Sequence, residues 1–161
     1  MDRLAKNIYF KKPDVLNKVR EIFGDDILDY KGDLDFNSLG EKVFSNKKEL
    51  EKLNRFMFPL IREEVKDLLN KNQKKDYIVV DAAVLFDCKL DLLCDYIILV
   101  ETSDENRKAF LKNKNLLNND IKLRIEGQHI KIDREKVDFF IDNNGSKDSL
   151  FKRVKDILVN I

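Results

Sequence analysis

Glycine is scarce in this sequence, and its few glycines are widely spaced. No two are closer than the eight positions that separate Gly24 from Gly32, and the five glycines are Gly24, Gly32, Gly40, Gly127 and Gly145. A loop that cradles phosphate with its backbone needs closely spaced glycines, as in G-x-x-x-x-G-K-[ST] or G-x-G-x-x-G. Neither pattern occurs in the sequence, so a phosphate-binding loop of either kind is excluded from these 161 residues.

Cysteine, histidine and long apolar runs are scarce too. Cys88 and Cys94 have neither C-x-x-C nor zinc-ligand spacing, so we expect two small buried thiols in a reducing compartment and no metal site. The only histidine, His129, has no Cys or Asp partner at triad or ligand spacing, which argues against a catalytic histidine. No apolar stretch approaches the ~20 residues of a membrane span, and the N-terminus has no apolar signal region. We therefore expect a cytoplasmic protein with no membrane partner.

The two signs of charge are balanced. There are 31 basic and 30 acidic side chains, which gives a net charge of +1. This balance argues against a protein built to hold nucleic acid electrostatically. The basic pairs Lys47-Lys48 and Lys74-Lys75 lie beside acids and are typical of solvated helix faces. The sequence leaves the oligomeric state open.

The first two-fifths of the chain are predicted to be helical. The length and the 43% hydrophobic content predict one globular domain over residues 1–161. Gly24 is expected to end the second helix, Asn37 or Ser38 to open the third, and Pro59 to kink or break the fourth. Apolar spacing places these helices at residues 2–9, 13–23, 37–44 and 47–72.

The rest of the chain alternates between strands and helices. Ser103 and Ser146 are expected to cap helices. Apolar runs predict strands at residues 77–81, 96–100 and 139–142, with helices at residues 103–113, 120–128 and 147–158. This order predicts an α/β fold with a parallel sheet flanked by helices.

Polar side chains follow two of the predicted strands. Asp81 ends the first strand, at the edge where parallel sheets bind ligands, and its carboxylate could hold magnesium or accept a hydroxyl proton. It could equally cap the next turn. Asn143 follows the third strand, and its amide suits a base edge or a ribose, although an ordinary turn also favours Asn.

Lysines gather between the two predicted helices at 103–113 and 120–128. Lys108, Lys112 and Lys114, with Arg124 on the next helix, could close over phosphates as a lid. They could equally be solvated surface charges.

Short motifs follow one another in a fixed order along the chain. They are D-R-L-A at residues 2–5, F-G at 23–24, L-G at 39–40, V-F-S-N at 43–46, P-L-I-R at 59–62, D-A-A-V-L-F-D at 81–87, R-I-E-G-Q at 124–128 and I-D-N-N-G at 141–145. Together they resemble the dephospho-coenzyme A kinase family over nearly the whole chain.

The resemblance implies a P-loop-kinase-like fold and a reaction. That reaction is transfer of the γ-phosphoryl group of ATP, with Mg²⁺, to the 3′-hydroxyl of dephospho-coenzyme A. Residues 2–72 would form the helical acceptor region and residues 103–128 the lid. By resemblance the site residues are Asp2 for catalysis, Asp81, Leu85, Phe86 and Arg62 for the acceptor, and Asn143, Lys112, Lys114 and Arg124 for the nucleotide.

The chain also departs from the family pattern. The family's first strand and P-loop, and the first aspartate of its D-x-D motif, have no counterpart before Asp2. Phe58 replaces a histidine, and the lid arginines fall near Phe110 and Asn113, with only lysines close by. Lysine lacks the planar fork that grips phosphate in two places.

We therefore expect an N-terminally incomplete domain, in which Met1 is an internal codon called as a start or the chain is a fragment; the sequence leaves open which of these holds. Such a chain is expected to have little or no kinase activity. The alternative is a non-catalytic, kinase-derived binding or regulatory module.

The absent strand has a structural consequence. In the family it lies at the centre of the sheet, flanked by the strands at residues 77–81 and 96–100. Without it these two must pair with each other or leave unpaired edges. Each buried, unpaired backbone group costs about 1–3 kcal/mol.

Overall fold

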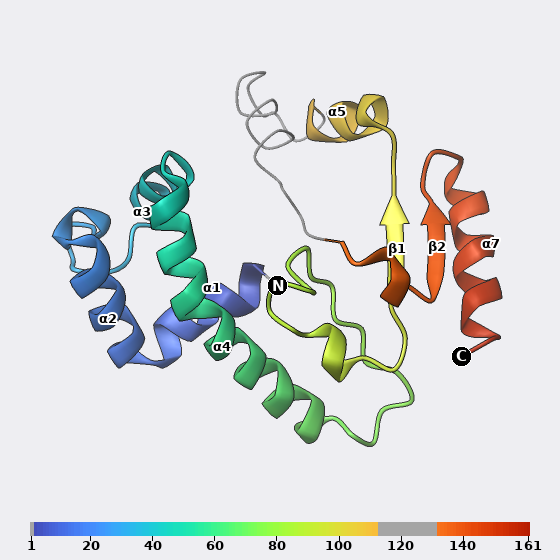
Figure 1. Ribbon diagram of the computed structural model, residues 1–161, viewed down its shortest axis with the longest axis horizontal. Helices are drawn as coiled ribbons and strands as arrows, with labels where there is room; N and C mark the ends of the chain where they lie inside the picture. Colours follow the sequence, from blue (N-terminus) through green and yellow to red (C-terminus); the bar gives the residue numbers. More distant parts are fainter. Residues whose placement is uncertain (1, 113–131) are drawn as a thin grey trace. The chain divides into compact units, whose positions relative to one another are not determined.

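The computed structural model describes residues 2–112 and 132–161. Its contacts divide the chain into two compact units, Met1–Leu90 and Asp91–Ile161, drawn in Figure 1. The helix predicted at residues 120–128 lies outside the described residues.

The first unit is built from four helices around one apolar core. Helices α1 and α3 pack against α4, and α2 packs against α1. Helix α4 turns Met57, Ile61 and Val65, at four-residue spacing, into the core, as expected for one face of a helix. The bounds of these helices are α1 Asp2–Lys11, α2 Pro13–Phe23, α3 Phe36–Phe44 and α4 Lys47–Lys71.

Two of the predicted helix boundaries are confirmed and two differ. Helix α2 begins at Pro13 and stops at Gly24, whose φ of 89° suits glycine. Helix α3 begins earlier than predicted, because the Asp35 carboxylate caps it by accepting from the Asn37 N–H at 2.9 Å. Helix α4 runs through Pro59 as one helix, so of the kink or break predicted there, the break does not occur.

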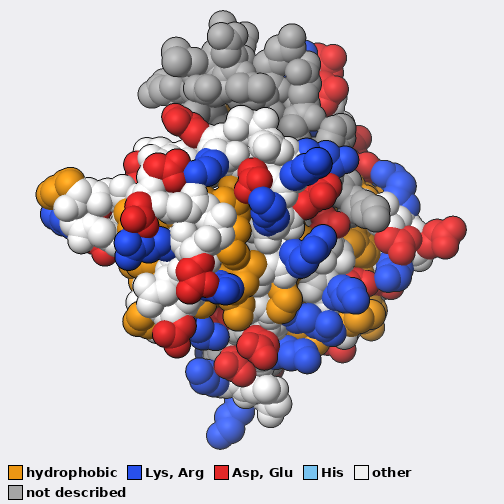
Figure 2. Space-filling view, turned by 60° about the vertical axis from the view of Figure 1, so that its left-hand side comes forward, with side chains coloured by type: hydrophobic (Ala, Val, Ile, Leu, Met, Phe, Trp, Pro, Cys, Tyr) orange, Lys and Arg blue, Asp and Glu red, His pale blue; other side chains and the backbone are white. Residues whose placement is uncertain are grey.

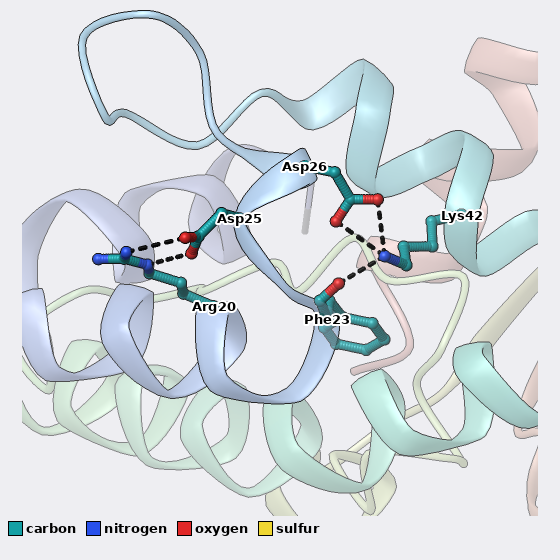
Figure 3. A network of polar contacts seen from close by, with 5 residues as sticks. All are labelled: Arg20, Phe23, Asp25, Asp26 and Lys42. Atoms are coloured by element: carbon teal, nitrogen blue, oxygen red, sulfur yellow. Dashed lines mark hydrogen bonds and ion pairs between the residues drawn. The ribbon is translucent and has the colours of Figure 1, made fainter.

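Lys42 fastens the end of α2 to α3, and Figure 3 shows its contacts beside a separate Arg20–Asp25 ion pair. Lys42 on α3 donates to the backbone oxygen of Phe23 and to both carboxylate oxygens of Asp26, the latter at 2.8 Å. Arg20 makes a two-pronged contact with Asp25. Because Arg20 and Lys42 donate these hydrogen bonds to the carboxylates, the pKa values of Asp25 and Asp26 lie below their ordinary value.

The second unit contains a parallel pair of strands. Strand β1 (Ile98–Glu101) pairs with β2 (Phe139–Asp142) in a register that aligns Ile98 with Phe139 and Glu101 with Asp142. Helix α5 (Asp104–Lys112) follows β1, and α7 (Lys147–Leu158) packs on β2, with Ile141 and Ile157 buried. The 3₁₀ turns η2 (Asp91–Leu93) and η3 (Arg134–Lys136) precede the two strands. The predicted parallel α/β arrangement with flanking helices is confirmed.

The predicted strand at residues 77–81 is wrong. These residues have no regular secondary structure, and Tyr77, Ile78 and Val79 are 59%, 43% and 88% exposed. A strand requires a neighbour for its backbone hydrogen bonds, and among the described residues the one sheet is the β1–β2 pair. Residues 77–81 therefore do not pair with the strand that was expected beside them.

The surface of the described residues carries both signs of charge. On the face shown in Figure 2, basic and acidic side chains are intermingled, with hydrophobic patches between them. Across residues 2–112 and 132–161, no helix has the length and apolar character needed to cross a bilayer.

Burial of Tyr9 generates a pH prediction. Tyr9 packs edge-on against Phe36, with 5.7 Å between ring centroids, and burial raises its pKa from 10.0 to about 12. The folded protein therefore keeps the phenol proton that the unfolded chain releases above pH 10. This contribution to stability is complete below pH 10 and is lost as pH rises through 12.

We expect Tyr9→Phe to make the loss of unfolding free energy between pH 10 and 12 shallower, by roughly 2 kcal/mol in total. Urea unfolding at several pH values measures it. Tyr30→Phe is the control, because Tyr30 is 90% exposed. Equal slopes for Tyr9→Phe and the unmodified protein would contradict the assignment.

Candidate functional site

The strands β1 and β2 end side by side, and the segments that follow them are joined by hydrogen bonds. The Asn143 N–H donates to the Glu101 backbone oxygen at 2.8 Å. The Thr102 hydroxyl lies 3.2 Å from the Asn143 backbone oxygen. Asn143, predicted to contact the nucleotide, is thus held at the carboxyl edge of the parallel pair, where α/β sheets bind ligands.

Asn144 makes the largest number of side-chain contacts at this edge. Its Oδ1 accepts from the Ser103 N–H at 2.7 Å and lies 3.1 Å from both the Thr102 hydroxyl and the Asn106 Nδ2. Its backbone N–H and its Nδ2 both donate to the Asp142 carboxylate. Ser103 caps α5 as predicted, accepting from the Asn106 N–H at 3.2 Å. The motif at residues 141–145 was the available sequence signal, but it did not single out Asn144.

Arg134 is a second residue that sequence reasoning missed. Its guanidinium binds both oxygens of Glu101, at 2.7 and 3.0 Å, and lies 5.1 Å from the centre of the Phe140 ring. The pair lowers the pKa of Glu101 through the hydrogen bonds from Arg134. This contact places a cation beside the last residue of β1.

The predicted acceptor residues of the first unit lie partly in a compact turn. Leu85 and Phe86 are half-buried, and the turn is closed by the Leu90 N–H donating to the Leu85 oxygen at 2.8 Å. Lys89 takes a φ of 54° there. Asp81 is exposed and precedes this turn; it does not end a strand, because the strand predicted before it is absent.

Arg62 has an unusual environment on α4. Its Nε is buried and has no hydrogen-bond partner, the one such side-chain atom among the described residues. Buried N–H groups nearly always find an acceptor, so an orphaned guanidinium nitrogen is a place where an anionic ligand would fit.

A groove of about 310 Å³ lies between α1 and α4. Lys11 and Glu64 pair across it at 2.9 Å, and Arg3 adds a further cation to its wall. The groove therefore offers cationic groups within the region expected to hold the acceptor.

The structure does not describe the side chains of the remaining predicted residues. Asp2 is the first residue of α1 and Lys112 the last of α5. Lys114 and Arg124 lie outside the described residues. In the described part of the chain, no group of three or more His, Cys, Asp or Glu side chains is placed to hold a metal ion.

The dephospho-CoA kinase family model matches residues 1–149. The chain belongs to the dephospho-CoA kinase family. Among curated members, it is 33% identical to the dephospho-CoA kinase of Fusobacterium nucleatum, over 96% of this chain and 80% of that protein. The enzyme of Listeria innocua is also 33% identical, over 95% of this chain and 78% of its own length.

A solved structure shows the same fold. It is the dephospho-CoA kinase from Campylobacter jejuni, with a TM-score of 0.64 and 23% identity, covering 98% of this chain and 81% of that one. Membership of the dephospho-CoA kinase family, inferred from the motifs, is therefore confirmed. The roles of the individual site residues stay predictions.

The turn that carries Leu85 and Phe86 yields a test through its cysteine. Cys88 is only 3% exposed, and burial raises its pKa to about 11. Burial raises the pKa of Cys94 as well, but the Cys94 side chain is only half-buried. At pH 8 the thiolate of Cys88 is therefore both rare and inaccessible. We expect iodoacetamide to modify Cys94 at least about tenfold faster than Cys88.

Mass spectrometry of peptides over time measures the two rates. The Cys94→Ser variant isolates the rate of Cys88, and the urea-unfolded chain shows the rate without burial. Equal rates in the folded protein would show that the turn is not packed as described.

Proposed function

We propose that this chain acts in the ATP-dependent phosphorylation of the 3′-hydroxyl of dephospho-CoA. The observation that carries the proposal is the turn after β2, where Asn143 is held between the ends of two parallel strands. An amide at that edge suits the adenosine end of ATP, because it both donates and accepts.

The acceptor side of the proposal rests on the first unit. Dephospho-CoA carries a pyrophosphate, and the buried Arg62 Nε lacks an acceptor. A guanidinium is well suited to phosphate, since its N–H groups match the phosphate oxygens. Leu85, Phe86 and Asp81 would complete this side.

The fit to ATP and Mg²⁺ is partial. The adenosine end is served by Asn143, but the sequence contains no glycine-rich loop for the triphosphate. Mg²⁺ commonly binds through substrate phosphates and one or two carboxylates, so the lack of a three-residue cluster in the described part is compatible with it.

We expect this chain to carry out the family reaction slowly or not at all. Phosphoryl transfer depends on positioned donors around the phosphates, and losing even one such donor typically lowers kcat by about 10²–10³. We expect ADP release with ATP, Mg²⁺ and dephospho-CoA to fall at least about 100-fold below that of the Fusobacterium nucleatum relative.

A coupled ADP-release assay measures this, with the Fusobacterium nucleatum enzyme assayed alongside as the positive control. Turnover comparable to that enzyme would sink the expectation of low activity and leave the family reaction standing.

Arg62 gives a sharper test of the acceptor side. Hydrogen bonds to charged groups are worth about 1.5–3 kcal/mol, so Arg62→Ala is expected to weaken dephospho-CoA binding by roughly 10- to 100-fold. Titration calorimetry measures the affinity. Arg55→Ala is the control, because Arg55 is an exposed arginine on the same helix. Unchanged affinity of Arg62→Ala would remove Arg62 from the acceptor site.

The alternative function is a non-catalytic module that binds dephospho-CoA or a partner. The replacement of a family histidine by Phe58 and the missing lid arginines favour it. Tight binding of dephospho-CoA without ADP release would support this alternative. We also propose that the protein is cytoplasmic, whichever of the two functions it has. Cys88 and Cys94 form no disulfide, which supports a reducing compartment.

A further inference from the structure

Asn144 joins two segments that the sequence holds far apart. Its Oδ1 accepts from Ser103, which lies 41 positions earlier and opens helix α5. Its other polar groups bind Asp142, at the end of β2. The Asn144 side chain thus contacts both the segment that joins β1 to α5 and the end of β2.

The orientation of the Asn144 amide is fixed by its neighbours. Oδ1 faces a backbone N–H, which can only donate, and Nδ2 faces the Asp142 carboxylate, which accepts. A reversed amide would set donor against donor and acceptor against acceptor. Asparagine therefore fits both partners at once, whereas aspartate would place a second carboxylate beside Asp142.

The donors around Oδ1 belong to the start of α5. Ser103 caps α5 and Asn106 lies in its first turn. The Thr102 hydroxyl can donate its single proton either to Oδ1 or to the Asn143 oxygen. The first turn of α5 and the turn that holds Asn143 are consequently fastened to each other.

We propose that Asn144 is a positioning residue for nucleotide binding, which makes the Asn143 turn and the first turn of α5 one unit. The identity of the ligand rests on the proposed function. Asn143 would contact the nucleotide, and Asn144 would act through Asn143.

Two variants separate the two roles. In Asn144→Ala the Ser103 amide loses its acceptor, so its hydrogen exchange is expected to accelerate about tenfold, and ATP is expected to bind several-fold more weakly. Asn143→Ala should weaken ATP to a similar degree but leave the Ser103 amide protected. NMR measures both quantities, using amide exchange rates and the shifts of the residue 143–145 amides during ATP titration.

Asn144→Asp serves as the conservative variant. It retains an acceptor for Ser103 and loses the donor to Asp142, so the Ser103 amide should stay protected. If Asn144→Ala does not fold, the unmodified protein still decides, since a scalar coupling between the Ser103 nitrogen and the Asn144 side-chain carbonyl carbon reports the bond directly.

The outcomes distinguish this inference from the proposed function. Unchanged Ser103 exchange in Asn144→Ala, or no such coupling in the unmodified protein, overturns the inference. If the unmodified chain shows no shift with millimolar ATP while Ser103 exchange accelerates in Asn144→Ala, the nucleotide assignment fails and the link through Asn144 stands.

Discussion

In the second unit, β1 and β2 are hydrogen-bonded in parallel. The position of the turn at Asn143, where we propose that the nucleotide binds, depends on this pairing. Parallel pairing aligns Glu101 with Asp142, so the chain leaves both strands at one edge. The Thr102 and Asn143 segments can then bind each other. A slip of one residue in the register would turn the strand side chains to the opposite face and part Ser103 from Asn144.

A strand needs a neighbouring strand for its backbone hydrogen bonds, and this explains why residues 77–81 form no strand. Their apolar and β-branched side chains favour a strand. Among the described residues, however, no ladder takes up their backbone groups, and the side chains of Tyr77 and Val79 face solvent. Strand propensity shows that a segment can adopt an extended backbone, whereas a strand forms only where another strand lies beside it to accept and donate hydrogen bonds.

Family membership and turnover are separate questions for this chain. The described residues include the turn at Asn143 and a half-buried Arg62 whose Nε is unpaired, which we propose as binding features on the nucleotide and acceptor sides. The glycine-rich loop that would hold the triphosphate is absent from the sequence. Because phosphoryl transfer relies chiefly on positioning and charge, binding can persist where catalysis is weak.

The sequence by itself determined the existence of the helices among the described residues, the strand at residues 139–142 and the family. Helix ends such as Pro13, Gly24 and Ser146 are local signals, and the motif at residues 141–145 placed Asn143 directly after β2. Only the tertiary structure decided that β1 pairs with β2, that Arg134 reaches Glu101 across 33 positions, and that Asn144 reaches Ser103 across 41. Such contacts depend on which elements meet in space, and no periodicity or capping pattern within one segment encodes that.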